Sequence, residues 1–170
     1  GNSSQSQRFE LVKDPRIDAS DEDMQAQFEL LLQIRDKLGE IHEAVERSQG
    51  IRGQIESWEK RLKENDNESL AAEAERVRER LREAESELVE LRARGGADSF
   101  NYPPKVNSKI ASLQSTVAYG DSRPPQQTYE VFELHARHAD EQLANLRKVI
   151  DTEVSTLNQK IAGAGVPAIG

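Results

Sequence analysis

A heptad-spaced apolar stripe returns three times along this chain and constrains its fold more than any other feature. Its three runs are Leu31, Ile34, Leu38, Ile41 and Val45; Leu70, Ala74, Val77, Leu81, Ala84, Leu88 and Leu91; and Tyr129, Phe132, Ala136, Ala139, Leu143, Leu146 and Ile150. Steps of three and four residues keep side chains on one face of an α-helix. The pattern therefore predicts an all-α fold, an elongated antiparallel bundle of long amphipathic helices.

Capping and turn residues divide the chain into four helices. Ser20 is a good N-cap with Asp23 three residues on, and Gly95 can supply a left-handed C-cap. Gly50 and Gly53 each weaken the first helix by about 1 kcal/mol, but a bend is expected rather than a break because the apolar stripe resumes after them. The expected helices span residues 20–65, 68–95, 106–120 and 125–162.

The lengths of these helices favour one topology. At 1.5 Å per residue, the first and fourth helices are about 66 and about 57 Å long, and the second and third are about 40 and about 24 Å long. The second and third together match the first, so we expect three columns with those two helices in series. A compact four-helix bundle, with the third helix reversed against the second, is the alternative.

The N-terminal residues have a different pattern. Phe9, Glu10 and Leu11 alternate briefly as in a β-strand, and Asp14-Pro15 favours a turn after them. A single strand is not stable without a sheet to join. We therefore expect residues 1–18 to be a terminal strand and linker from an upstream β domain, and residues 19–170 to be the helical bundle domain.

Composition excludes several classes of function. The chain has 170 residues, a formal net charge of -8 and no cysteine. It offers no basic face to displace the counterions of a nucleic acid, so no nucleic-acid partner is expected. No run of 18 apolar residues exists, so no membrane span is expected. The absence of cysteine excludes thiol catalysis and leaves the compartment open.

Two histidines are the only residues whose spacing suggests a metal site. His135 and His138 are three residues apart on one helix and could share a face, with Asp140 or Glu141 nearby. A di-metal bundle repeats its carboxylate and histidine ligands on other helices, and this chain does not. We therefore interpret these two, and the isolated His42, as surface histidines, and we expect no metal and no organic cofactor.

Carboxylates are frequent but carry no catalytic signature. Glu56 and Glu59, like Glu75 and Glu79, stand among lysines and arginines at spacings typical of solvated helical charge pairs. Residues 163–167 are glycine-rich but lack the flanking strand and helix of a phosphate loop. The chain itself is therefore expected to have no catalytic residues.

One irregular segment is a candidate partner-binding loop. Phe100, Asn101, Tyr102 and Pro103 follow the glycine pair, and exposed aromatic residues favour interfaces. Such residues more often plug the end of a core where a column is interrupted, and we favour that interpretation.

The order of several segments resembles a known family. The segments are residues 12–16 (VKDPR), 23–28 (DMQAQF), 30–38 (LLLQIRDKL), 100–103 (FNYP), 106–110 (VNSKI) and 122–124 (SRP). They are similar to the C-terminal helical region of bacterial BNR-repeat, sortilin-like β-propeller proteins, often labelled glycosyl hydrolases or photosystem II stability/assembly factor-like proteins. The resemblance covers about residues 8–169. It implies an upstream propeller and an export signal, and therefore an extracytoplasmic location, periplasmic or secreted.

These observations lead to one functional hypothesis and two alternatives. The chain is expected to be a non-catalytic helical interaction or scaffolding domain, the C-terminal appendage of a larger exported propeller protein. Its expected partner is protein: an upstream β-propeller or Ig-like domain of the same polypeptide, or a second copy. It could instead belong to a glycoside hydrolase-type enzyme whose active site lies outside this chain, or be a free-standing coiled-coil adaptor.

Overall fold

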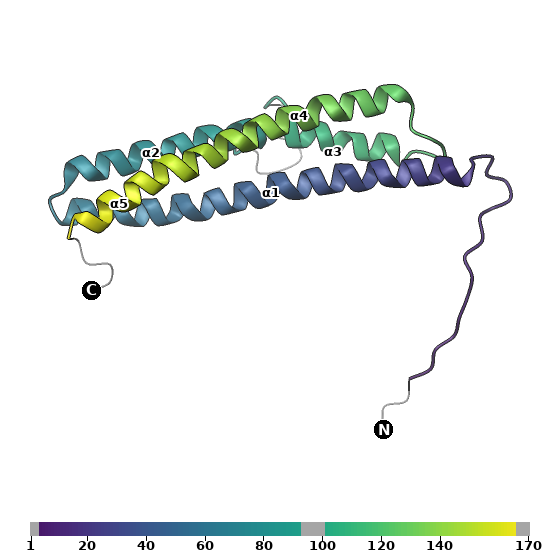
Figure 1. Cartoon of the computed structure of the whole chain (residues 1–170), viewed down its shortest axis with the longest axis horizontal. Coiled ribbons are helices and arrows are strands. Elements are labelled where there is room, and N and C mark those ends of the chain that lie inside the picture. Colours follow the sequence, from purple (N-terminus) through teal and green to yellow (C-terminus); the bar gives the residue numbers. More distant parts are fainter. Residues whose placement is uncertain (1–3, 93–100, 166–170) are drawn as a thin grey trace.

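The protein is all-helical, as its apolar stripes predict (Figure 1). The computed structural model describes residues 4–92 and 101–165, and no strand occurs among them. The helices are α1 (Asp21–Glu64), α2 (Glu68–Leu88), α3 (Val106–Val117), α4 (Gln126–Val149), the π-helical turn η2 (Ile150–Val154) and α5 (Ser155–Gly163). Within those described ranges, none of the helices has the length and apolar character that a bilayer crossing needs.

The helices form three columns, which confirms the predicted topology. Figure 1 shows α1 running the length of the bundle, α2 and α3 following one another beside it, and α4, η2 and α5 running back as one column. Both α1 and α4 pack against α2 and against α3. The alternative, in which α3 reverses against α2, is wrong. Because the number of columns is odd, the start of α1 and the end of α5 lie at opposite ends of the bundle.

Helix α1 begins where its capping signal predicts. The Ser20 hydroxyl accepts from the Asp23 amide at 3.1 Å, and the Asp23 carboxylate accepts from the Ser20 amide at 3.2 Å. The helix is continuous through Gly50 and Gly53, so the prediction that it does not break is confirmed. A β-carbon at either glycine would meet nothing within 4 Å, which shows that neither is needed for close packing.

Helix α2 ends earlier than predicted. It stops at Leu88, and Val89 is extended with φ −136° and ψ 151°. Leu91, the last residue of the predicted stripe, therefore lies outside the helix and is half-buried. Gly95 and Gly96, the predicted C-cap, lie outside the described residues.

Local and tertiary interactions explain this early end. The Glu90 carboxylate accepts from the backbone amide of Arg92 at 3.0 Å and from its guanidinium at 2.7 Å, a local turn that competes with helix. Leu88 is fully buried, and among the described residues the next buried apolar position in the return column is Val106 at the start of α3. The return column therefore changes from α2 to α3 at this point, and α2 ends there.

The core is one continuous seam along the bundle. Its largest fully buried side chains come from every column; they are Leu30, Ile34, Ile41, Leu62, Leu81, Leu88, Ile110, Leu143, Leu146 and Leu157. Leu38 and Ile150, also predicted to be core, are partly buried against it. The prediction of one shared core is thus confirmed.

The fourth predicted helix contains a π-helical turn that its sequence did not signal. Val149 and Val154 are 3% and 8% exposed, so both face the core although they are five residues apart. Five residues of α-helix would rotate them about 140° from one another. The wider π turn brings both to the same face, and the column then continues as α5 to Gly163, close to the predicted end.

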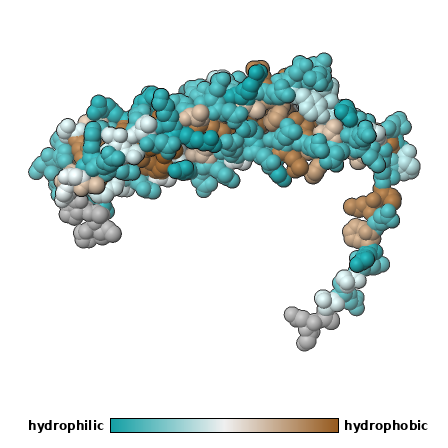
Figure 2. Space-filling model, in the orientation of Figure 1, coloured by the Kyte–Doolittle hydropathy of each residue, from teal (hydrophilic) through white to brown (hydrophobic). Residues whose placement is uncertain are grey.

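The described N-terminal residues form an extended tail. Figure 2 shows hydrophobic residues on this tail, away from the body of the bundle. Phe9, Leu11 and Val12 are 80–89% exposed, and the predicted strand pairs with no other part of the chain that the structure describes. The predicted turn is confirmed, because the Ile17 amide donates to the Asp14 carbonyl at 3.0 Å.

Candidate binding groove between α2 and the C-terminal column

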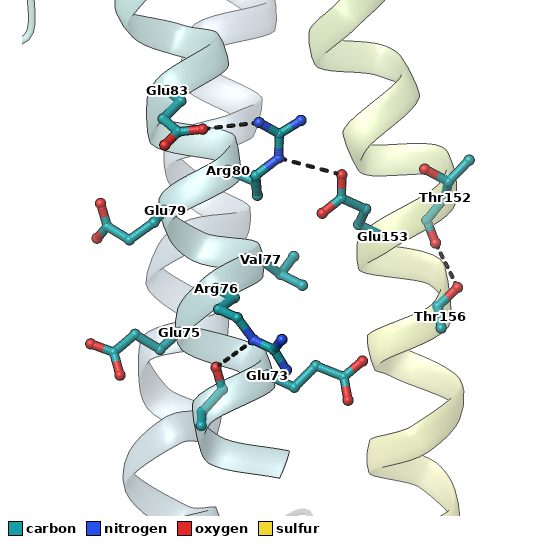
Figure 3. Close-up of a pocket in the computed structure, with 11 residues that line it drawn as sticks. Glu73, Glu75, Arg76, Val77, Glu79, Arg80, Glu83, Thr152, Glu153 and Thr156 are labelled. Atoms are coloured by element: carbon teal, nitrogen blue, oxygen red, sulfur yellow. Dashed lines mark hydrogen bonds and ion pairs between the residues drawn. The ribbon is translucent and has the colours of Figure 1, made fainter. Parts of the chain in front are cut away.

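The candidate site is a groove of about 930 Å³ between α2 and the π turn with α5 (Figure 3). It lies where the third column changes helical phase. Its walls come from two helices that are far apart in the sequence. The lining residues are Ala72, Glu73, Glu75, Arg76, Val77, Glu79, Arg80, Glu83, Thr152, Glu153 and Thr156.

Ion pairs cross this groove and join its two walls. Arg80 contacts Glu153 at 3.7 Å and Glu83 at 3.0 Å, while Lys160 contacts Glu73 at 2.5 Å. Each pair has at least one side chain that is half exposed or more, so each contributes little to stability. Their effect is to position the charged walls rather than to hold the helices together.

The floor of the groove is apolar, and its hydroxyl groups are already engaged. Val77 is 6% exposed at the base. Thr152 donates to the Lys148 carbonyl at 2.7 Å, and Thr156 donates to the Thr152 carbonyl at 2.8 Å. Both hydroxyls donate to backbone carbonyls of their own column, one in α4 and one in the π turn, so neither is paired with a base that could activate it as a nucleophile.

The opposite side of α2 holds a buried polar network against α1. Glu85 is fully buried, and its Oε1 accepts from the Ser48 hydroxyl at 2.7 Å and from Arg52 Nε at 2.8 Å. Arg78 on α2 donates to Glu59 on α1 at 2.7 Å. Each of the two helices therefore contributes one buried glutamate that pairs with an arginine of the other helix.

This network corrects the prediction that Glu59 lies on a solvated face. Glu59 is only 6% exposed and pairs with another helix rather than with its own sequence neighbours. The signal was present in the sequence, because Glu59 falls between Ile55 and Leu62 at the spacing of the apolar stripe. Glu56 and Glu75, by contrast, are exposed as predicted.

The structure does not gather the predicted histidine pair into a larger ligand set. His135 is half-buried, and burial, then Lys109 and His138, lower its pKa. Asp140 accepts from Lys37 of α1 at 2.6 Å and is thereby engaged in another contact. In residues 4–92 and 101–165 no three histidine or carboxylate side chains come close enough to hold a metal ion.

The predicted partner-binding loop is described from Asn101 onward; Phe100 lies outside the described residues. Asn101 and Pro103 are exposed, whereas Tyr102 is half-buried beneath the Arg92 guanidinium, 4.2 Å from its ring centre. Hydrogen bonds from Arg92 lower the pKa of Glu90 to about 2. Tyr102 thus stacks on Arg92 of its own chain rather than on the core, and both the plug interpretation and partner binding by this loop stay predictions.

Comparisons with known protein families, with curated proteins and with solved structures find no significant match for this chain. The function of the groove and of the bundle has therefore to be argued from their own residues.

Proposed function

We propose that this chain is a non-catalytic scaffolding and interaction domain, a rigid rod that separates the segments on its two sides. The observation that carries the proposal is the three-column topology. The start of α1 and the end of α5 lie at opposite ends of the bundle (Figure 1). Trp58 of α1 and Ile161 of α5 line one groove, so the two columns are in register at that end. At 1.5 Å per residue, the rod from Glu22 to that level is about 54 Å long.

Contacts between parallel columns support a rod that resists bending. Lys37 of α1 donates to Asp140 of α4 at 2.6 Å, and Arg147 of α4 donates to Glu40 of α1 at 2.8 Å. Burial alone lowers the pKa of Lys37, but its hydrogen bonds to Asp140 and Glu40 raise it overall. The charged form of Lys37 is therefore favoured, and it connects the first and third columns.

A second set of contacts fixes the end of the rod where α1 begins. Gln27 donates to the carbonyls of Val117 and Gly120, both at 2.7 Å. Arg123 donates to Asp23 at 2.7 Å, and this bond, followed by those from Ser20, lowers the pKa of Asp23 to about 2. The cap of α1 is thus tied to the turn between α3 and α4.

The charge pairs of the groove favour a binding surface over a glycosidase site within this chain, and they do not bear on an active site elsewhere in a parent enzyme. A glycosidase needs two carboxyl groups about 5–9.5 Å apart across a scissile bond, one of them able to donate a proton. In the groove, Glu73, Glu83 and Glu153 each already contact a lysine or arginine. These pairs favour the interpretation of the groove as a binding surface.

The resemblance to propeller-associated helical regions extends the proposal to the domain's context. In that context the exposed tail over residues 4–19 would connect the rod to a preceding β domain, and the protein would act outside the cytoplasm. The exposed apolar side chains of Phe9, Leu11 and Val12 support this, because a terminal strand would bury such side chains when it joins a sheet.

The spacer function is tested by a distance between two spin labels. The chain has no cysteine, so Glu22→Cys and Ala162→Cys label single exposed sites. Double electron–electron resonance should give one narrow distribution of distances between the two labels, centred at about 54 Å. The pair Glu22→Cys and Lys63→Cys reports on α1 alone and serves as the control. A broad distribution for the first pair, beside a narrow one for the control, would refute a rigid spacer.

A further inference from the structure

We propose that two copies of this chain associate through the outer face of α2, with the two α2 helices antiparallel about a two-fold axis. This inference rests on the proposed interaction function and names its partner as a second copy. The face begins at the rim of the groove in Figure 3 and points away from α1. The partner is identified by the order of charges along α2, because two copies of this helix placed antiparallel bring opposite charges together.

The seam of this face is a row of residues three and four positions apart. Ala72, Arg76, Glu79, Glu83 and Ser86 recur at the spacing that keeps side chains on one side of a helix. Most are exposed, whereas Val77, Leu81 and Leu88 of the same helix are buried in the core. The row therefore presents a straight, mixed-charge surface to solvent.

Reversing the helix onto itself pairs opposite charges along this seam. When the two-fold axis passes between residues 77 and 78, Arg76 of one copy lies opposite Glu79 of the other. The same register places Ala72 opposite Glu83, so that a small residue meets a long one. The symmetry produces each of these pairs twice.

The flanking positions of the same register are also complementary. In an antiparallel helix pair, the residues on one side of the seam lie next to the residues on the same side of the partner's seam. Each flanking residue then faces a partner residue two positions away from the one that the seam register alone would place opposite it. On one flank Glu75 then meets Arg82 of the second copy, and on the other flank Glu73 meets Arg80. Both of these flank pairs bring opposite charges together, a pattern that sets partner and orientation. At the ends of the helix, Glu68 falls opposite Val89 and Glu87 falls opposite Asp66, so the charge matching is confined to the central turns of α2.

The geometry within one chain leaves these groups able to turn toward a partner. Arg82 contacts Glu79 of its own helix at 3.4 Å, which is longer than a good charged hydrogen bond. On the other flank, Arg80 contacts Glu83 at 3.0 Å and Glu73 contacts Lys160 at 2.5 Å, so that pair forms between copies by exchanging these contacts. Ser69 and Ser86 lie opposite one another in this register, and their small side chains allow the helices to approach at both ends of the seam.

Such an interface is polar and confined to one helix from each copy, so its strength depends on concentration and salt. Interfaces smaller than the standard size are typically weak or transient. Exposed ion pairs are screened as the Debye length falls from about 10 Å at 0.1 M salt to about 3 Å at 1 M. We therefore expect a reversible dimer that forms at high protein concentration and low salt.

Sedimentation velocity of the whole 170-residue chain tests the proposal. The wild type should shift from monomer toward dimer with rising concentration at low salt, and revert at about 1 M salt. Glu75→Arg or Arg82→Glu alone places like charges opposite one another and should weaken association at least tenfold. An equimolar mixture of the two variants should recover it, because the new arginine at position 75 then faces the new glutamate at position 82.

Matched controls make each result decisive. Glu46→Arg, an exposed change of the same charge on α1, should leave association unchanged, and circular dichroism checks that every variant is helical. A wild type that stays monomeric at millimolar concentration and low salt overturns the proposal, as does a mixture that associates no better than its components. The spin-label distance is measured in dilute monomer, so failure here leaves the spacer function separately testable.

Discussion

Removing the buried carboxylate of Glu85 should destabilise the protein strongly. Glu85 is fully buried, its Oε1 accepts from Ser48 and Arg52, and its Oε2 has no hydrogen-bond partner. Breaking a buried pair by deleting one partner costs about 3–5 kcal/mol. The Arg52 side chain is 23% exposed and regains some hydration, so we expect Glu85→Ala to lower the free energy of unfolding by about 3 kcal/mol.

Removing both charges should cost much less than removing one. The double variant Arg52→Met with Glu85→Leu eliminates the desolvated ions and the unpaired Oε2, and apolar replacements of buried pairs are often neutral or stabilising by about 1–4 kcal/mol. The remaining Ser48 hydroxyl can bond to its own helix backbone. Urea unfolding followed at 222 nm measures all variants with a common slope. A cost below about 1 kcal/mol for Glu85→Ala, or a double variant as unstable as the sum of its single changes, would refute this reasoning.

Four other predictions follow from the packing and from the titration of His135. Gly50→Ala and Gly53→Ala should each raise the unfolding free energy by about 0.5–1 kcal/mol in thermal melts, because the new methyl group meets open space in a helix interior; a loss of stability would mean that α1 requires glycine at that position. Leu146→Ala, at a site 1% exposed, should lower it by about 2–5 kcal/mol in the same melts, and a cost under 1 kcal/mol would place this residue outside the core. The pKa of His135 is lowered in the folded state, so its contribution to the unfolding free energy should be complete above about pH 6.5 and should fall at lower pH, where the unfolded chain binds the proton more readily. His135→Gln should therefore reduce the dependence of the unfolding free energy on pH, measured from about pH 8 to 5. Amides over residues 9–12 should exchange within the dead time of a hydrogen-exchange experiment in dilute monomer, and protection there would show that the tail belongs to the core.

The elements that could be predicted are those set by local chemistry or by repeated burial. The start of α1 depends on Ser20 and Asp23, which are three residues apart, so their reciprocal hydrogen bonds follow from the sequence. The three columns follow from helix lengths. The end of α2 depends instead on where the return column passes to α3, a tertiary condition with no marker at Leu88 or Val89.

The site was predicted less well than the fold, for a related reason. Glu73, Arg80 and Glu153 look like ordinary solvated charges on two helical segments, and their contacts across the groove depend on how two columns are placed. Polar residues buried within one seam are easier to find. Ser48 lies between Ile41 and Ile55 at seven-residue spacing, which marks it as a core position despite its polarity.

The π turn shows why core and groove could not be predicted separately. Leu146 and Val149 point into the core before it, and Val154, Leu157 and Ile161 do so after it. The interval of five residues between the two valines falls outside the usual three-and-four rhythm, and a regular α-helix would direct one of them to solvent. The wider turn keeps both valines buried, and residues 152–156 of the turn and of α5 form the second wall of the groove opposite α2. One local change of helical phase therefore completes the core and contributes a wall of the groove whose other wall, α2, carries the proposed dimer face.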